Sequence, residues 1–267
     1  MKKKTKDTDY LFLSAYVHAC QARLGEVPVN KPVIFSELSS MAPDSRLVDF
    51  FRLKYDYHNA KVLVKSTASG VIEDRLLSPL GRFDAALLKN AYLENSLSGL
   101  SAEFSAALLD AKDTLARTGD PRLSDFILDK AYIAELLHTA QAARSAFLEG
   151  YARLFADSIN LRSVVRMLKS GVERDKLDSI LSDCGTVSPG AIKAVYPETS
   201  AVLKLYSSTK LAPTLHEAET AAAGGGFSAF EEQCRAALDG HMDSLKLQCF
   251  GEQPLIYYLY TIEGIKS

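Results

Sequence analysis

The chain has 267 residues, of which 47% are hydrophobic, and its formal net charge at pH 7 is −2. This length and apolar content suffice to bury a substantial core in one or two domains or in several small lobes. The near-neutral charge, without a basic stripe, argues against a nucleic-acid-binding protein.

Helical periodicity runs through almost the whole chain, and hardly any segment alternates as strands do. The basic start MKKKTK, residues 1–6, is either a solvated tail or a weak contact with an anionic surface. A first helix is expected over residues 9–24, and a loop with Pro28 and Pro32 follows it. A short helix is expected over residues 36–41.

The next stretch, RLKYDYHNAKVLVK (residues 52–65), recurs 101 positions later as RLFADSINLRSVVR (residues 153–166). An accidental charge run rarely keeps both residue identity and spacing, so the chain is predicted to contain a duplicated unit. The polar members of the motif are Arg52, Asp56, Asn59 and Lys61 in the first copy and Arg153, Asp157, Asn160 and Arg162 in the second.

Asp56 and Asn59 are unfavourable in a helix interior, because their short side chains compete for backbone groups. Being three residues apart, they share one helix face, whereas Lys61 and Arg162 lie on roughly the opposite side. We expect hydrogen bonds from Asp and Asn to the backbone or cap of a neighbouring helix, and Arg52, four residues earlier, is within reach of an ion pair with Asp56. A direct role in partner binding, chiefly through Lys61 and Arg162, is the alternative.

A second repeated stretch follows each copy: GRFDAALLKNAY (residues 81–92) matches GTVSPGAIKAVY (residues 185–196) at an offset of 104. Asp84 and Ser188 occupy N-cap positions, where a side-chain oxygen can accept a bond from an orphan amide. Both are therefore predicted to cap the helix that follows.

Gly81 and Gly185 open these two stretches and are expected to form the turn that ends the preceding element. The repeated unit is thus a long helix, a glycine turn and a capped helix. A period near 100 residues exceeds that of the common solenoids, which favours small helical lobes over single solenoid rungs.

The second half of the chain is predicted to begin with one long helix from the Asp120 cap to about residue 171, with Gly150 as a site for a bend. AAAGGG, residues 221–226, resembles a flexible joint into the last lobe. The fold class expected is all-α with three related helical lobes. Their expected bounds are residues 1–119, 120–223 and 224–267, the last being the start of an incomplete lobe.

Recognised catalytic and metal-binding patterns are missing from the sequence. There is no glycine-rich phosphate loop and no GxSxG motif. The five histidines lack metal-ligand spacing, and His58 is expected in packing or at the surface. We therefore expect no catalytic residue, no cofactor and no metal. A deep pocket in which titratable groups converge around His58 or Asp157 would require revision.

Cellular placement is indicated by two further features. The four cysteines lack disulfide or metal spacing, which favours a reducing interior. The longest apolar run, residues 254–262, is too short to cross a bilayer, and a signal peptide is not recognised. We expect a cytosolic protein without direct bilayer insertion.

Seven segments in order along the chain resemble the C subunits of the A-type/V-type rotary ATPases, the family that includes the d subunit of the eukaryotic vacuolar pump. Each segment alone is a loose pattern, whereas together with the internal repeat they are fairly specific. The segments are YVHACQARL (16–24), FFRLKYDYHNAKVLVKS (50–66), SPLG (78–81), DPRLSDFILDKAYIAELL (120–137), YARLFADSINLRSVVRMLKSG (151–171), CGTVSPGAI (184–192) and FGEQPLIYYLYTIEGIK (250–266).

The resemblance implies an all-helical, three-lobed funnel in the central rotor stalk, with pseudo-threefold symmetry. Its cavity would receive the shaft formed by the D and F subunits, and its lower face would rest on the membrane proteolipid ring. Such an adapter transmits torque without binding nucleotide or ion, and it is cytoplasmic and attached to the membrane through the complex.

Two departures from the family pattern concern the third copy of the repeat. The family's last helix normally continues through an Asn-Ile-Arg motif beyond the position of Ser267. Gly264 and Ser267 stand where the other copies have Asp and Asn. The alternative to a rotor adapter is a helical-repeat scaffold that gathers partners on a concave face.

Overall fold

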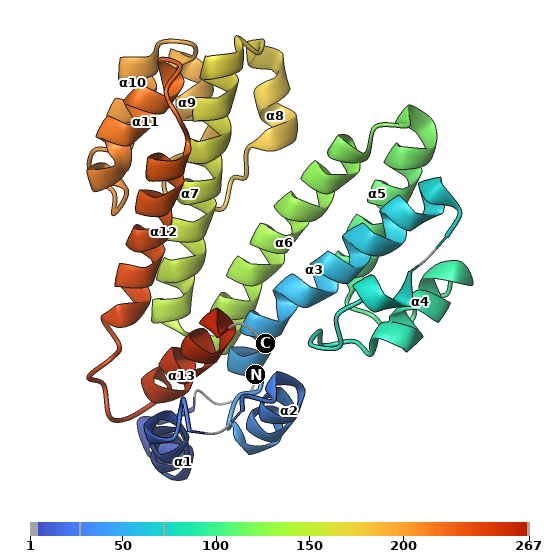
Figure 1. Cartoon of the computed structure of the whole chain (residues 1–267), viewed down its shortest axis with the longest axis vertical. Helices are drawn as coiled ribbons and strands as arrows, with labels where there is room; N and C mark the ends of the chain where they lie inside the picture. The colour runs from blue at the N-terminus through green and yellow to red at the C-terminus, as the bar shows by residue number, and fades with distance from the viewer. Residues whose placement is uncertain (1–4, 27, 72, 266–267) are drawn as a thin grey trace. The chain divides into compact units, whose positions relative to one another are not determined.

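The computed structural model describes residues 5–26, 28–71 and 73–265, with the side chains of Ala68 and Ser69 left out. The regular structure of these residues is entirely helical (Figure 1), which confirms the all-α prediction. The α-helices are α1 (Leu11–Ala22), α2 (Lys31–Met41), α3 (Arg46–Ser69), α4 (Ala85–Leu93), α5 (Ala102–Thr118), α6 (Pro121–Ala143), α7 (Ala146–Ser170), α8 (Leu177–Ile180), α9 (Pro189–Val195), α10 (Thr199–Lys204), α11 (Leu215–Ala222), α12 (Ser228–Asp243) and α13 (Gln253–Gly264). Single 3₁₀ turns cover Asp7–Tyr10, Asp74–Leu76, Arg174–Lys176 and Ala212–Thr214.

Two compact units make up the chain. The first contains the residues up to Ser145 together with those from Met242 onward, and the second spans Ala146–His241. The first copy of the repeated motif lies on α3 in the first unit, and the second copy lies on α7 in the second unit.

The core of the first unit is built on α3, which packs against both α6 and α5 (Figure 1). Leu53, Ala60 and Leu63 of α3 are fully buried, as is Leu128 of α6. Helical spacing places these α3 side chains along one stripe, and burial of such a stripe supplies most of a helix's stability in a folded protein.

A buried polar cluster links the helices of this core. Glu135 of α6, only 4% exposed, accepts hydrogen bonds from Tyr57 Oη at 2.8 Å, Ser101 Oγ at 3.0 Å and Arg82 Nη1 at 2.8 Å. The pKa of Tyr57 is raised by burial and then by the Glu135 charge, so its hydroxyl keeps the proton that it donates. Arg82 also reaches Asp56, so one arginine neutralises two buried carboxylates.

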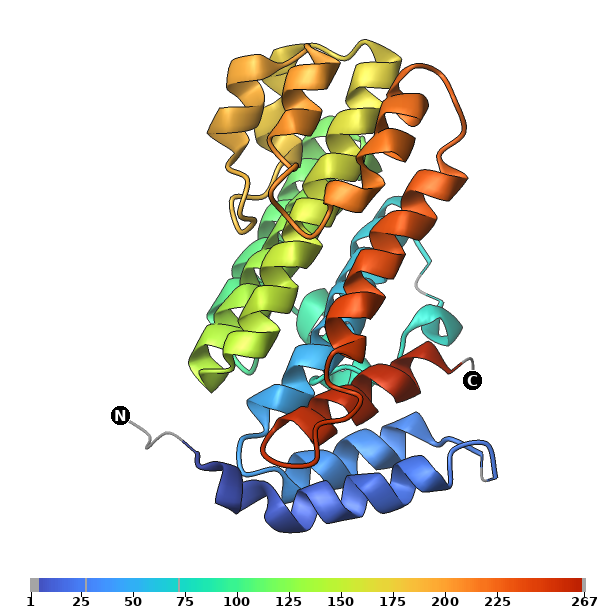
Figure 2. The ribbon, with the colours of Figure 1, turned by 90° about the vertical axis from the view of Figure 1, so that its left-hand side faces the viewer.

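The first unit also holds α1, α2 and α13 (Figure 2). Helix α13 packs on α1 and α3, and Leu259 of α13 and Val17 of α1 are buried. Ser14 Oγ of α1 donates a hydrogen bond to Gly251 O at 3.3 Å, which ties the segment before α13 to α1. Helix α2 starts five residues before the predicted short helix, because Asn30 caps it and Pro32 lies in its first turn.

The second unit packs shorter helices against α7. Helix α11 lies on α7, α10 packs on α9 and α11, and α8 packs on α7 and α9. Leu161 and Val164 of α7 share a buried cluster with Ile192 of α9, with Phe230 of α12 and with Tyr206, which follows α10. The shorter helices of this unit thus serve to cover one face of a single long helix.

One long helix was predicted from Asp120 to about residue 171, and this prediction was wrong. Helix α6 ends at Ala143, and α7 begins at Ala146. Arg144 adopts a left-handed conformation with φ 57°, and Ser145 N donates to Ala140 O at 3.1 Å, as in a Schellman ending. Gly150 lies inside α7, where an added Cβ would be 3.3 Å from His241 Cε1.

The division into units also differs from the expected lobe bounds. Residues 120–143 were assigned to a second lobe, but α6 packs on α3 and α5 in the first unit. Residues 221–226 were expected to connect two lobes, but the helices on both sides of them lie largely in the second unit. The apolar faces decide these boundaries, and the sequence alone does not show which face meets which.

Among the described residues, none of the helices is both long and apolar enough to traverse a bilayer.

The Glu135 cluster yields a stability prediction. Glu135→Ala removes a buried carboxylate that accepts from the buried Tyr57 hydroxyl and the partly buried Ser101 and Arg82, and it should lower the free energy of unfolding by about 3–5 kcal/mol. Asp129→Ala is the matched control, because Asp129 lies on the same helix and also forms an ion pair, with Lys61, but is 49% exposed. The control should cost less than about 1 kcal/mol. Urea denaturation followed by circular dichroism measures both, and equal effects would contradict a structural role for the cluster.

Candidate functional site

In the first unit, the candidate site starts with Asn59, whose side chain is fully buried. Its Nδ2 donates to Ser78 O at 2.9 Å, and its Oδ1 accepts from Ser78 N at 2.7 Å. The carboxamide therefore pairs with both polar backbone groups of one residue, as a second backbone would. This pairing fastens the segment before α4 to the middle of α3.

Asp56, one helical turn earlier, is also 0% exposed. Its Oδ1 accepts from Phe83 N at 3.3 Å, and its Oδ2 accepts from Arg82 Nε at 2.6 Å. Burial raises the pKa of Asp56, and the adjacent Arg82 charge opposes that shift. Together, Asp56 and Asn59 hold residues 78–83 at two points, and we call this arrangement the polar joint.

The second unit contains the same arrangement. Asn160 Nδ2 donates to Ser182 O at 2.7 Å, and Ser182 N donates to Asn160 Oδ1 at 2.8 Å. Asp157 accepts from Val187 N at 3.0 Å and from Thr186 Oγ1 at 2.5 Å. A hydroxyl thus takes the place that a guanidinium has in the first copy.

The serine of each joint was not among the residues selected from the sequence. Ser78 Oγ accepts from Leu80 N at 3.3 Å, and Ser182 Oγ accepts from Cys184 N at 3.3 Å. Each hydroxyl therefore stabilises a turn in its own loop. A signal was present: the offset of 104 that relates Gly81 to its counterpart also relates Ser78 to Ser182.

The two repeated glycines do not end the long helices, contrary to the prediction. Gly70 and Gly171 end them, with φ of 75° and 61°. These left-handed values suit glycine, which has no Cβ to clash with its carbonyl.

Gly81 and Gly185 instead lie against the carboxylates of the joints. An added Cβ on Gly81 would lie closer than 3.0 Å to Asp56 Oδ1, and one on Gly185 would lie equally close to Asp157 Oδ1. Real Cβ atoms essentially never approach a neighbour so closely. Because the glycine has no side chain, each carboxylate can reach the backbone amide two residues after that glycine.

The helix after each joint begins with a side-chain cap. Asp84 Oδ1 accepts from Ala86 N and Leu87 N, both at 3.0 Å. Ser188 Oγ accepts from Ala191 N at 3.2 Å. Each cap satisfies amides that the first turn of a helix leaves without a partner.

A repeated ion pair crosses each loop. Lys89 Nζ lies 2.6 Å from Asp74 Oδ1, and Lys193 Nζ lies 2.5 Å from Asp178 Oδ2. Both acidic residues are well exposed, so each pair contributes little energy by itself. The equivalent pairs indicate that the two copies share the same fold from the long helix to the capped helix after it.

The two arginines that precede the carboxylates do not pair with them. Arg52 donates to Leu80 O at 3.2 Å and to Gly81 O, which adds a further clasp on the loop. Arg153 Nη2 lies 2.9 Å from Glu149 Oε1, one turn back along α7. The guanidinium of Arg52 is thus committed to loop carbonyls and that of Arg153 to Glu149, instead of to the carboxylates of the joints.

The remaining basic pair differs between the copies. Lys61 Nζ lies 2.6 Å from Asp129 Oδ1 and joins α3 to α6. Arg162 Nε is buried and has no hydrogen-bond partner within the described residues. In the proposed third copy, Gly264 is the last residue of α13, and Ser267 lies outside the described residues.

Asp157 and His58 each line a cavity. Asp157 lines a cavity of about 420 Å³ in the second unit, together with Arg153 and Lys210. Its carboxylate already accepts from Val187 N and Thr186 Oγ1, so its two oxygens serve the joint. His58 lines a larger cavity in the first unit, whose walls also include two lysines and a tyrosine.

Comparison with protein families places these features in context. The family model described as "ATP synthase (C/AC39) subunit" matches residues 33–263, a span that contains both polar joints. The chain belongs to the ATP synthase (C/AC39) subunit family.

Membership in this family confirms the resemblance to the C subunits of the A-type/V-type rotary ATPases and makes the chain a component of a rotary ATPase complex. A search of curated proteins found no match. For a member of the C/AC39 family, the repeated joints are therefore features of a protein that works inside a larger machine.

The close approach at the glycines yields the second prediction. Gly81→Ala and Gly185→Ala should each lower the free energy of unfolding by about 1–3 kcal/mol, because the new methyl group displaces a hydrogen-bonded carboxylate. Gly99→Ala is the control, since nothing lies within 4 Å of an added Cβ there. The control should stay within about 0.5 kcal/mol of the parent protein. Thermal and urea melts that rank all three variants equally would refute this explanation of the glycines.

Proposed function

We propose that the chain is a non-catalytic adapter in the central rotor stalk of an A-type/V-type ATPase or ATP synthase. It joins the shaft formed by the D and F subunits to the membrane proteolipid ring and so couples ATP turnover to proton or sodium transport. The family match over residues 33–263 carries this proposal.

The polar joints support a torque-bearing role. A rotor adapter must transmit a load without yielding, and closely packed, hydrogen-bonded helices deform little. In each copy, one long helix holds the following segment through two buried side chains one turn apart. We assign Asp56, Asn59, Asp157 and Asn160, together with the two caps, primarily to this structural role, and not to direct partner contact.

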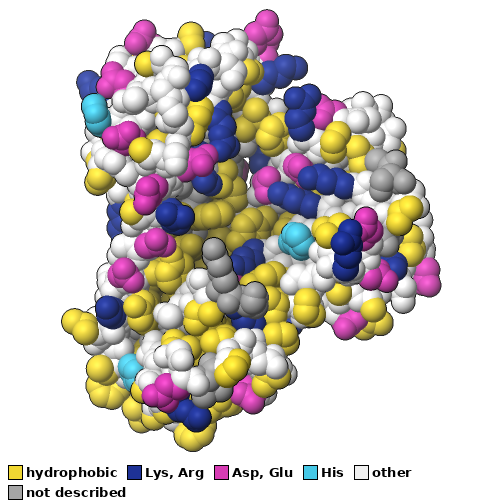
Figure 3. Space-filling model, viewed as in Figure 1, with side chains coloured by type: hydrophobic (Ala, Val, Ile, Leu, Met, Phe, Trp, Pro, Cys, Tyr) yellow, Lys and Arg dark blue, Asp and Glu magenta, His cyan; other side chains and the backbone are white. Residues whose placement is uncertain are grey.

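An exposed apolar surface in the first unit supports a role inside a complex. Leu11 and Phe12 of α1 are 53% and 74% exposed, and Leu247 and Phe250, ahead of α13, are 87% and 68% exposed. Figure 3 shows hydrophobic side chains gathered over the part of the molecule that contains α1 and α13. Large apolar side chains exposed together commonly mark a surface that a partner covers.

The adapter proposal includes an arrangement of three related lobes around a central opening that admits the shaft. It also includes attachment at the cytoplasmic side of the membrane through the complex, without binding nucleic acid. A concave helical scaffold outside the rotary machine would instead have partners other than these rotor components.

Reconstitution tests the adapter role. The chain, purified together with the D and F subunits and the proteolipid ring of the same cell, should associate with both the shaft and the ring. A Phe12→Ser, Phe250→Ser double variant should keep its melting temperature and lose one of the two associations, because the apolar surface is removed.

Leu109→Ser is the matched control, since Leu109 is also an exposed apolar residue, 42% accessible, but lies on α5. It should assemble as the parent protein does. Failure of the parent chain to bind either the shaft or the ring would remove the adapter proposal.

A further inference from the structure

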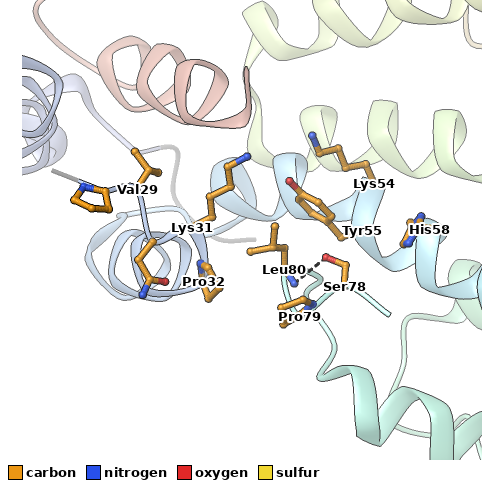
Figure 4. A pocket seen from close by; sticks show the side chains of 11 residues that line it. Val29, Lys31, Pro32, Lys54, Tyr55, His58, Ser78, Pro79 and Leu80 are labelled. Atoms are coloured by element: carbon orange, nitrogen blue, oxygen red, sulfur yellow. Dashed lines mark hydrogen bonds between the residues drawn. The ribbon is translucent and has the colours of Figure 1, made fainter. Parts of the chain in front are cut away.

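The cavity that contains His58 lies within the first unit and has a volume of about 900 Å³ (Figure 4). Pockets that bind small molecules commonly have volumes of about 300–1,000 Å³. Its walls come from the start of α2, one face of α3 and the loop that the polar joint holds. The lining residues are Pro28, Val29, Asn30, Lys31, Pro32, Lys54, Tyr55, His58, Ser78, Pro79 and Leu80.

One end of the cavity is cationic. Figure 4 shows Lys31 and Lys54 pointing toward the same place, with the Tyr55 hydroxyl near them. Burial first, and the charge of Lys31 second, lower the pKa of Lys54 to about 8. The Glu263 carboxylate pairs with Lys54 and favours its charged form.

The Lys31 ammonium has few partners within the described residues. The residue is only 7% exposed, and burial lowers its pKa. An ammonium has three donors, but within the described residues the hydrogen bond recorded for Nζ is one to Glu263 O at 3.4 Å, and no ion pair is formed. A buried charge without a counterion is costly, so this position favours an anion from outside the unit.

The carboxylate of Glu263 is already used by other groups. It pairs with Lys54 and accepts from Tyr55 Oη at 2.9 and 3.0 Å. Two lysines against one carboxylate leave an excess of one positive charge. The N-terminus of α2, which begins at Lys31, adds a partial positive charge at the same end.

Comparison of the two copies shows that these polar residues are not needed for the joint. At the offset of 101, Lys54 and Tyr55 correspond to Phe155 and Ala156, and His58 corresponds to Ile159. The second copy keeps the same joint with apolar residues at these positions. The polar lining is therefore a property of the first copy alone.

The other lining residues are mostly apolar and include Val29, Pro32, Pro79 and Leu80. His58 Nε2 is bonded to Leu76 O at 2.9 Å, so the imidazole is held at the rim by the backbone. We propose that this cavity binds an anionic amphiphile. Its carboxylate or phosphate lies against Lys31, and its apolar body lies along Pro32, Pro79 and Leu80.

Three probes of equal chain length test the proposal by isothermal titration calorimetry on the full chain below micelle-forming concentrations. Decanoate and decyl phosphate carry an anionic head, whereas decanol does not. At least one anionic probe should bind with one-to-one stoichiometry, and decanol should bind at least about tenfold more weakly, as expected from loss of a charged hydrogen bond. The relative affinity of the two anions identifies the preferred head group.

Two variants locate the site. Lys31→Met should weaken binding of the preferred anion about tenfold or more. Val29→Glu, which places a negative charge on a loop in the cavity wall, should do the same even if the first variant alters folding. Lys65→Met is the control for loss of a lysine charge, because Lys65 lies on α3, pairs with Asp125 and does not line the cavity. It should bind as the parent chain does.

The proposal is overturned if decanol binds as tightly as both anions, if no probe binds with one-to-one stoichiometry, or if Lys31→Met and Val29→Glu leave the affinity unchanged. The result does not depend on assembly with the rotor shaft or the ring, so it distinguishes failure of the ligand site from failure of the adapter role.

Discussion

The structure depends on a simple constraint: a carboxylate and a carboxamide, one turn apart in the middle of a long helix, are fully buried and must find partners. In the first unit Asn59 takes both backbone groups of Ser78, and Asp56 takes the amide of Phe83. Buried polar groups left unpaired cost about 1–3 kcal/mol each. The loop after the helix therefore has one favourable position, and the absence of a Cβ at Gly81 makes that position attainable.

Once this joint is fixed, the two copies differ in what they add. The first copy extends Asp56 through Arg82 to Glu135 and so binds α3, α5 and α6 into one polar cluster. The second copy stops at Thr186, and an open cavity lies beside it. The two copies thus share the joint but differ in the residues around it. The proposed adapter role requires this combination if the copies carry load alike but meet different partners or ligands.

Much of the local structure could be predicted from the sequence, because it depends on neighbours within a few turns. The duplicated motif and the caps at Asp84 and Ser188 belong to this class. What could not be predicted involves distant partners: Glu135 lies 78 residues from the tyrosine it binds, and neither its burial nor that contact leaves a mark on local periodicity. The helix end at Arg144 could not be predicted either, because this left-handed residue is not a glycine. The boundary between the units lies directly after it, at Ser145.

Amide hydrogen exchange on the native chain tests the central claim most directly. The amides of Ser78, Phe83, Ser182 and Val187 lie in loops, where exchange is normally fast, but each donates to a buried side chain of a joint. If the joints hold the loops, these four amides should exchange only on global unfolding of their own unit. Exchange at the rate of exposed loop amides would show that the joints open freely and would contradict the account.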